Sequence, residues 1–319
     1  MNSTTAPHTD PRIPGDFPSP GRLETALRSA AQQLAARSTA PFERLFGPQV
    51  DGAFGILMYH RTSHHYLGAP APTWNVTPER FRRQMLGLLR RGFEPWPLRD
   101  ILDHHQRRHP IPPRAFVVTF DDGHASNFHH AWPILRELNI PATIFLATAY
   151  LDSDAPFPFD DWAAVGSGRV ERESWLPLTT RQCVEMHDGG LIELGAHTHT
   201  HADFRDRPDA LRSDLATCLS ELQTRFGYGD ATSAFPYGTK RMGFSGPVPA
   251  AAAKRAGMLC SLTTESERVS PSTDPFDWGR FTAHGYDTAA TLAVKLSGWY
   301  ERLRNTWRRI RRLDTRHAT

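Results

Sequence analysis

The sequence predicts an α/β protein whose parallel β-sheet is closed, or nearly closed, into a β/α barrel. Short apolar runs alternate along the chain with amphipathic stretches of helical period. Two of the runs, residues 115–120 (AFVVTF) and 142–147 (ATIFLA), are almost entirely apolar, as expected of strands buried on both faces of a parallel sheet. Seven strands of this kind are enough for a barrel, and an open, doubly wound sheet is the alternative.

The positions of the elements follow from this alternation in chain order. Strands are predicted at Ala53–Tyr59, Ala115–Phe120, Ala142–Ala147, Leu191–Gly195, Thr232–Phe235, Met258–Thr263 and Trp278–Thr282. Helices are predicted at Pro78–Arg91, Ser126–Asn139, Thr179–His187 and Pro208–Phe226. Thr77 followed by Pro78 has the form of a helix N-cap with a first-turn proline.

The predicted barrel occupies residues 53–290 and has other segments on both sides. Residues 1–20 are rich in proline and poor in apolar side chains, so we expect a flexible tail. Residues 21–52 are predicted to form an N-terminal helical segment, because apolar residues recur there at helical spacing. Residues 291–319 are predicted to form a basic amphipathic C-terminal helix.

Composition excludes several classes of protein. The chain has 319 residues, with 37 Lys+Arg against 34 Asp+Glu, and this net charge of +3 does not indicate a nucleic-acid partner. Its longest uncharged, mostly apolar run, Ile140–Leu151, is shorter than the roughly 20 residues of a membrane helix. The N-terminus lacks the pattern of a secretory signal, so we expect a cytoplasmic protein. Its cysteines, Cys183, Cys218 and Cys260, are too widely spaced for a disulfide framework or a zinc cluster.

Polar side chains follow three of the predicted strands at the point where each strand ends. Asp121 and Asp122 follow AFVVTF, His197 and His201 follow LIELG, and His60 follows AFGILMY. In parallel β/α folds the active site lies at the carboxyl ends of the strands, so we expect these side chains to converge. The alternatives are a solvated Asp-Asp-Gly turn, an exposed histidine loop and a core histidine at position 60.

The two histidines suit a metal ion. His197 and His201 are four residues apart, so one helical turn would place both on the same face. One carboxylate from the neighbouring strand end would complete a set of two histidines and one aspartate, which leaves positions open for water and substrate.

The same residues resemble a known family. T-F-D-D-G at 119–123, H-T-x-x-H at 197–201 and P-Y-G at 236–238 resemble the motifs of the polysaccharide deacetylases of the NodB-homology type (carbohydrate esterase family 4). The resemblance covers about residues 53–282. It implies a distorted (β/α)7 barrel and a divalent metal ion, expected to be Zn²⁺. It also implies that Asp121 is the general base, that Asp122, His197 and His201 bind the metal, and that the backbone N–H of Tyr237 helps to hold the oxyanion.

Two departures from the family pattern affect the assignment of roles. The family has an arginine where this chain has Ala234, and Arg280 is the expected substitute for orienting Asp121. The family often carries its general acid on a C-terminal Leu-x-x-His strand, which is missing here. The L-M-Y-H sequence ending at His60 resembles the circularly shifted subset that deacetylates exopolysaccharides such as poly-N-acetylglucosamine. This resemblance implies that His60 is the general acid, with His284 as the alternative.

The predicted function is metal-dependent hydrolysis of the N-acetyl amide of an N-acetylated sugar, with release of acetate, in exopolysaccharide or cell-surface glycan biosynthesis. The substrate is expected to be an oligo- or polysaccharide, and it could be lipid-linked. The alternatives are another C–N substrate, such as a formamido sugar or small amide, and a catalytically inactive sugar-binding barrel. Six tryptophans could stack on sugar rings: Trp74, Trp96, Trp132, Trp162, Trp175 and Trp278. Of these, Trp162, Trp175 and Trp278 are the favoured candidates, because they fall in predicted loops or at strand ends.

The C-terminal stretch allows two interpretations. An apolar stripe recurs at helical spacing between residues 296 and 313, with six arginines off the stripe. We favour a helix docked on the barrel with a solvated basic face. The alternative is an interfacial helix that holds the protein on the inner face of the membrane through anionic lipid.

Overall fold

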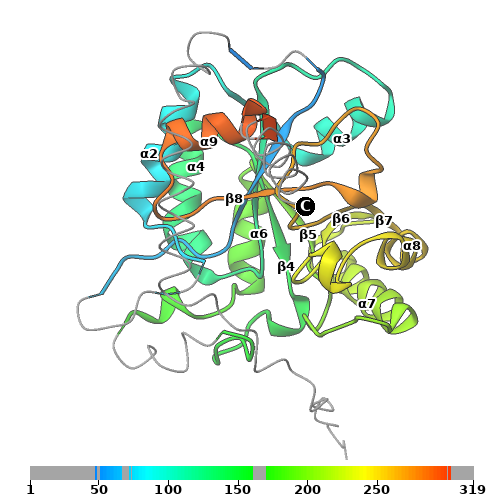
Figure 1. Cartoon of the computed structure of the whole chain (residues 1–319). Coiled ribbons are helices and arrows are strands. Elements are labelled where there is room, and N and C mark those ends of the chain that lie inside the picture. The colour runs from blue at the N-terminus through cyan, green and yellow to red at the C-terminus, as the bar shows by residue number, and fades with distance from the viewer. Residues whose placement is uncertain are drawn as a thin grey trace, which may run out of the picture.

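The structure is a computed structural model that describes residues 47–48, 51–66, 72, 74–160, 170–299 and 301–302. Within these ranges, parallel strands curl around a common core and helices cover the outside, as Figure 1 shows. The predicted tail at 1–20 and most of the predicted helical segment at 21–52 lie outside the described residues.

The sheet runs in the order β7-β6-β5-β4-β3-β1-β8, and its paired strands are all parallel. The seven strands of this path are those that the sequence predicts, with small shifts at their ends: β1 (Gly55–Tyr59), β3 (Ala115–Phe120), β4 (Ala142–Leu146), β5 (Ile192–Ala196), β6 (Ala231–Ala234), β7 (Met258–Leu262) and β8 (Phe281–Thr282). An additional strand, β2 (Glu94–Pro95), pairs with the start of β3 and is too short to give a sequence pattern.

The two edges of the sheet approach each other near β8. Phe281 pairs with Leu57 of β1, and Trp278, just before β8, forms a parallel bridge with Leu262 of β7. The backbone N–H of Thr263 also donates to the carbonyl oxygen of Trp278 at 2.7 Å. The predicted distorted β/α barrel is therefore confirmed, and the alternative of an open sheet is wrong.

Helices alternate with the strands and form the outer layer. They are α2 (Pro78–Leu89), α3 (Leu98–Gln106), α4 (Trp132–Leu138), α6 (Thr180–Asp188), α7 (Pro208–Phe226), α8 (Pro247–Arg255) and α9 (Ala289–Leu296). Shorter helical turns occur at η1 (Asn127–Ala131), η2 (Thr148–Tyr150), η3 (Arg172–Ser174), η4 (Lys240–Met242) and η5 (Pro275–Asp277). As predicted, Thr77 caps α2, since its hydroxyl accepts from the backbone N–H of Arg80 at 3.3 Å.

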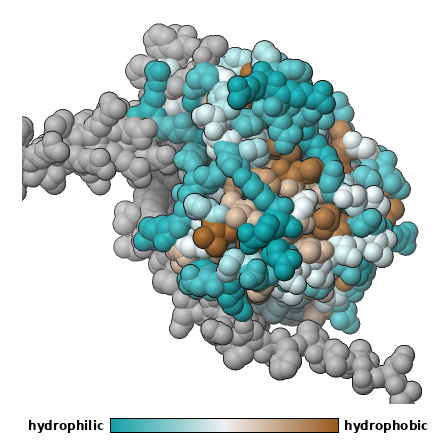
Figure 2. Space-filling model, turned by 90° about the vertical axis from the view of Figure 1, so that its right-hand side faces the viewer, coloured by the Kyte–Doolittle hydropathy of each residue, from teal (hydrophilic) through white to brown (hydrophobic). Residues whose placement is uncertain are grey.

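The surface mixes hydrophilic and hydrophobic residues. On the face that Figure 2 shows, hydrophobic residues form small groups among a larger hydrophilic area. Among the described residues, no helix has both the length and the apolar character needed to cross a membrane.

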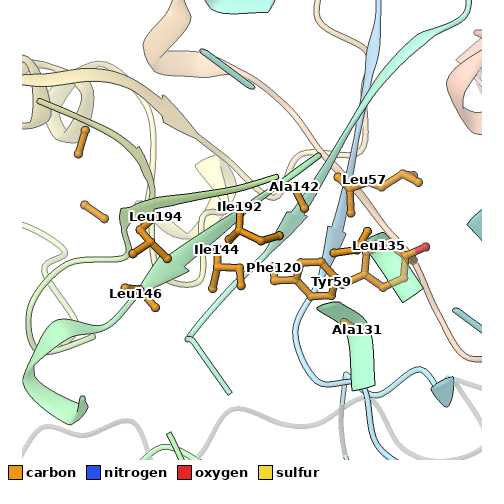
Figure 3. Close-up of a cluster of buried hydrophobic side chains, with 14 of the residues drawn as sticks. Leu57, Tyr59, Phe120, Ala131, Leu135, Ala142, Ile144, Leu146, Ile192 and Leu194 are labelled. Atoms are coloured by element: carbon orange, nitrogen blue, oxygen red, sulfur yellow. The ribbon is translucent and has the colours of Figure 1, made fainter. Parts of the chain in front are cut away.

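The core has two layers because successive residues of a strand point to opposite faces of the sheet. One cluster includes Leu57, Tyr59 and Phe120, which pack toward Ala131 and Leu135 of the helical layer, as Figure 3 shows. The second contains the alternate side chains of the same and other strands together with a fully buried tryptophan: Ile56, Val117, Phe145, Cys260, Leu262 and Trp278. The barrel is thus filled on both faces of its sheet.

The C-terminal segment departs from the continuous helix predicted for 291–319. Helix α9 ends at Leu296, and Gly298 has a φ of +85°, so a turn separates α9 from the helical backbone that resumes at Trp299. The indole N–H of Trp299 donates to the carbonyl oxygen of Gly47 at 3.0 Å. Residues 303–319, which carry most of the predicted arginine-rich face, lie outside the described residues.

Candidate active site

The polar clusters that the sequence places at strand ends come together at one end of the barrel. Asp121 directly follows β3, His197 directly follows β5, and Arg280 directly precedes β8. Since β3, β4 and β5 are neighbours in the sheet, the first two clusters meet across β4. The side chains of Asp121, Asp122, His197 and His201 are all buried.

Asp122, His197 and His201 form a compact set of ligand atoms. Oδ1 of Asp122 lies 3.4 Å from Nε2 of His197 and 3.4 Å from Nε2 of His201, and one ligand atom from each residue falls within 4.8 Å of the others. Nδ1 of His197 lies 2.9 Å from the carbonyl oxygen of Ala234, which can only accept, so Nδ1 carries the proton. Nε2, the other ring nitrogen, faces Asp122, which is the arrangement found in histidines that bind metals.

The backbone around these ligands adopts left-handed conformations. The predicted helical turn over 197–201 is wrong: the segment is a loop, in which Thr198 has a φ of 64° and His201 a φ of 54°. The hydroxyl of Thr198 accepts from the backbone N–H of His201 at 3.0 Å and closes this loop. Asp122 also has a positive φ, 71°. Such conformations are costly for non-glycine residues and cluster at functional sites.

Asp121 is held by Arg280 in a two-pronged ion pair. Nη1 donates to Oδ1 at 2.6 Å and Nη2 donates to Oδ2 at 2.8 Å, and both side chains are buried. The predicted contact between Arg280 and Asp121 is therefore present. Burial alone would raise the pKa of Asp121, but the charges of Arg280 and His197 outweigh it and lower the pKa. Asp121 is thus an ionised carboxylate beside the metal-ligand set.

His60 and His284 differ in their suitability as proton donors. His60 is half-buried, and burial lowers its pKa from the ordinary value of 6.5 against the opposing charges of Asp122 and Asp121. Burial and the charge of Lys295 lower the pKa of His284 to about 4, which leaves that imidazole neutral near pH 7. The charges of Asp122 and Asp121 act on His60, so His60 lies beside the predicted base, and this position favours it as the proton donor.

Tyr237 lies beside the metal-ligand set. Its ring centroid is 5.0 Å from that of His201, and its φ of 62° turns the backbone at the P-Y-G segment. The third predicted motif thus reaches the same site as the first two.

Comparison with known proteins relates the chain to one family. Residues 108–258 match the family model described as polysaccharide deacetylase. The matched residues are 151 of 319, just under half of the chain. The predicted resemblance to polysaccharide deacetylases is therefore confirmed.

Individual relatives match this chain over a short segment or at low identity. A segment of 124 residues, 39% of this chain, is 31% identical to the poly-beta-1,6-N-acetyl-D-glucosamine N-deacetylase of Escherichia coli (strain K12), but it spans only 18% of that relative. The protein of the same name from Staphylococcus epidermidis (strain ATCC 35984) is 23% identical over 237 residues, which are 72% of this chain and 74% of the relative. Both names belong to the exopolysaccharide subset that the L-M-Y-H sequence predicts.

A solved structure shows the same fold. The Streptococcus pyogenes deacetylase PplD, in complex with acetate, superposes with a TM-score of 0.62 at 18% identity, covering 78% of this chain and 99% of that one. The likeness supports the deacetylase barrel as the fold of this chain.

The sequence did not indicate a role for His124, which lies in the same site. Its Nε2 is 3.4 Å from Oδ2 of Asp122, the oxygen on the other side of the carboxylate from His197 and His201. The imidazole is buried and packs edge-on against Phe157, with ring centroids 5.0 Å apart. Burial opposes ionisation of Asp122, but hydrogen bonds from His124, His197 and His201 lower its pKa well below the ordinary value. The position of His124, directly after Asp-Asp-Gly, was the available signal.

Phe159 was also missed. Its ring stacks on that of His201, with the centroids 3.8 Å apart, and the neighbouring Asp160 forms a buried ion pair with Arg61. The segment around Phe159 thus forms one wall of the site, and its polar and proline-rich sequence gave no sign of this.

Of the tryptophans favoured for stacking on sugar rings, Trp175 and Trp278 are buried, so the prediction is wrong for these two. Trp175 is buried next to Val170 and Leu176, and Trp278 is fully buried in the barrel core. Trp162 lies outside the described residues. Trp74 is 56% exposed, and its ring stacks on that of His60 with the centroids 5.6 Å apart.

Proposed function

We propose that this chain is a metal-dependent N-deacetylase of N-acetylated glucosamine polysaccharide. The observation that carries the proposal is the convergence of Asp122, His197 and His201 beside the ionised Asp121. The names of the relatives from Escherichia coli and Staphylococcus epidermidis support the choice of sugar.

The donor set fits a divalent ion. Two imidazole nitrogens point at one carboxylate oxygen at 3.4 Å, and the hydrogen bond of His197 to Ala234 fixes the tautomer that binding requires. Asp122, His197 and His201 would hold the ion, and this mixed set of imidazole and carboxylate supports Zn²⁺. When bound, such an ion polarises an amide carbonyl and lowers the pKa of water toward about 7.

The residues around this set divide the proton transfers between them. Asp121 accepts a proton from the attacking water, whose oxygen bonds to the acetyl carbon. The backbone N–H of Tyr237 donates to the oxygen that becomes negative at that carbon. When the C–N bond breaks, His60 gives a proton to the departing amine, and acetate is the second product. Arg280 does not touch the reacting atoms; it is a positioning residue that keeps Asp121 ionised and oriented.

The cellular setting is part of the proposal. We propose that the enzyme acts in exopolysaccharide or cell-surface glycan biosynthesis and works in the cytoplasm. The three cysteines are all free and buried, which agrees with a reducing compartment.

Acetate release tests the function directly. Purified protein is incubated with β-1,6-linked N-acetylglucosamine pentamer, before and after chelation, and acetate is measured. We expect release by the intact protein, loss after chelation and recovery with Zn²⁺. His201→Ala should lose both bound metal and turnover, whereas Asp121→Asn should keep the metal and lower kcat by about 10²–10⁴-fold.

The products of the reaction distinguish the proposed function from its alternatives. Release of formate from a formamido sugar without release of acetate from the pentamer would point to another C–N substrate. Binding of the pentamer without hydrolysis of any amide, in metal-loaded protein, would support an inactive sugar-binding barrel.

A further inference from the structure

A row of aromatic rings, of which Trp74 is exposed and the others are half-buried, extends from the proposed general acid. The ring of His60 stacks on Trp74, Trp74 lies 6.1 Å from His284 between ring centroids, and His284 stacks on Tyr286 at 4.7 Å. The four ring planes differ pairwise by 22°, 30° and 14°. We call the rings of Trp74, His284 and Tyr286 the aromatic platform.

Trp74 is unusually exposed for so large an apolar side chain. It is 56% exposed, and among the described residues it is the one aromatic side chain in the set of exposed large hydrophobics. An indole of this kind contributes to stability mainly when buried, so packing within the chain does not explain its place.

The backbone nevertheless fixes Trp74 firmly. It has a φ of 52°, a costly conformation for a bulky residue. Its carbonyl oxygen accepts from the N–H of Arg61 at 3.3 Å, and the N–H of Val76 donates to the carbonyl oxygen of Arg61 at 3.1 Å. Between them, the Asn75 side chain accepts from the N–H of Ser63 and donates to its carbonyl oxygen, both at 2.9 Å. The segment that follows β1, which begins at His60, therefore holds this conformation in place.

A buried polar network supports the other half of the platform. Nε2 of Gln84 donates to the carbonyl oxygens of His284 and Asp287, at 3.0 and 2.9 Å. The carboxylate of Asp287 accepts from the N–H of His284 at 2.9 Å and from Nζ of Lys295 at 2.8 Å. Gln84, Asp287 and Lys295 are buried, so the loop that carries His284 and Tyr286 is anchored from beneath.

We propose that the aromatic platform is a sugar-binding subsite that holds a pyranose ring of the glycan next to the residue being deacetylated. This inference rests on the proposed function. One face of a pyranose presents C–H groups, which pack on the electron-rich face of an aromatic ring. Because the rings are rigidly mounted before binding, little conformational entropy is lost on contact. The platform begins next to His60. A sugar ring stacked on the platform therefore places the adjacent sugar residue of the glycan near the proton donor.

The test compares Trp74→Ala with Trp74→Phe on β-1,6-linked N-acetylglucosamine pentamer. We expect Trp74→Ala to raise KM about tenfold, with kcat changed much less and the melting temperature close to that of the wild type. Trp74→Phe keeps a ring and should restore most of the lost affinity. Tyr286→Ala should also raise KM, whereas Tyr286→Phe should not. Val248→Ala, which removes an equally exposed apolar side chain on α8, is the control and should change nothing.

Calorimetric titration of the pentamer separates the two proposals. Binding that weakens in Trp74→Ala without any acetate release would sustain the platform and reject the deacetylase function. Acetate release with an unchanged KM in Trp74→Ala would reject the platform and leave the function standing. If the intact protein does not bind the pentamer at all, the proposal of a sugar-binding platform is also rejected.

Discussion

At the scale of single residues, the carboxylate of Asp121 depends on one partner for its charge. Burial penalises its ionised form, and the guanidinium of Arg280 provides the largest opposing effect, at 2.6 and 2.8 Å. A lowered pKa stabilises the folded state above the ordinary carboxyl value of 3.8, and this contribution is lost as the pH falls through the folded-state pKa. Arg280 therefore links the stability of the barrel to the protonation state of the proposed base.

Arg280→Met removes that partner without adding a new charge. Burial then dominates, so the pKa of Asp121 should rise and the acidic limb of the pH–rate profile should move to higher pH. Breaking a buried ion pair from one side typically costs about 3–5 kcal/mol of unfolding free energy. Urea unfolding and the pH dependence of kcat/KM measure the two effects. Arg82→Met, which breaks an exposed pair with Glu137, is the matched control and should alter neither; an unmoved acidic limb in Arg280→Met would show that Asp121 is not the base.

His60→Ala should remove the alkaline limb of the pH–rate profile. A general acid must be protonated, so the rate falls as the pH rises through its pKa, and burial sets that pKa of His60 below 6.5. We expect a loss of about 10²–10⁴-fold in kcat. His284→Ala should retain the limb, because His284, with a pKa of about 4, is already neutral there. If the limb instead disappears in His284→Ala and persists in His60→Ala, the two roles are reversed.

The residues of the site differ in how far the sequence could reveal them. Asp121, Asp122, His197, His201 and His60 could be predicted because each follows an apolar strand, and parallel strands end together. Trp74 could be named only as one of six candidate tryptophans, since an exposed tryptophan and a buried one look alike in a sequence. The backbone of Trp74 has a positive φ, and no glycine or other local sequence signal indicates this conformation.

At the scale of elements, the strands were more predictable than the helices. All seven strands of the main path could be located. The runs of β3 (AFVVTF) and β4 (ATIFL) are almost entirely apolar, whereas those of β6 (ATSA) and β8 (FT) give a weaker signal. Helix α8 (PVPAAAAKR) was missed because prolines at positions 247 and 249 suggest a loop, although proline is well tolerated in a first helical turn. The loop at 197–201 was taken for a helical turn, since histidines four apart fit either form.

Tight packing between strands provides a prediction at this scale. A Cβ added at Gly195 of β5 would lie 2.5 Å from Cδ1 of Phe145 and 3.0 Å from the carbonyl oxygen of Thr232, so neighbours on both sides would have to move. Gly195→Ala should lower the unfolding free energy by about 1–3 kcal/mol. Gly229→Ala is the control, because nothing lies within 4 Å of its added Cβ. Equal urea midpoints for the two variants would contradict the packing of β4, β5 and β6 described above.

At the scale of the whole molecule, the chain around 297–302 connects parts that are distant in sequence. Trp299 bonds to Gly47, and Glu301 accepts from the side chain of Arg268, which also pairs with Asp51 at 2.7 Å. Trp299 belongs to the apolar stripe that an interfacial helix would insert into lipid, but here its indole is part-buried and bonded within the protein. These contacts support the docked interpretation of the C-terminal segment.

Two truncations separate docking from membrane binding. Removal of residues 298–319 deletes Trp299 and Glu301 and leaves Arg268 with one carboxylate fewer, so it should lower the unfolding free energy by about 1–3 kcal/mol. Removal of residues 303–319 alone keeps these contacts and should cost less. Under the docked interpretation the intact protein should not bind liposomes that contain anionic lipid. An interfacial helix would give the opposite pattern, because each arginine near an anionic surface adds on the order of 1 kcal/mol of attraction that salt weakens. Binding that high salt reverses, and that disappears with residues 303–319, would therefore replace docking by membrane contact.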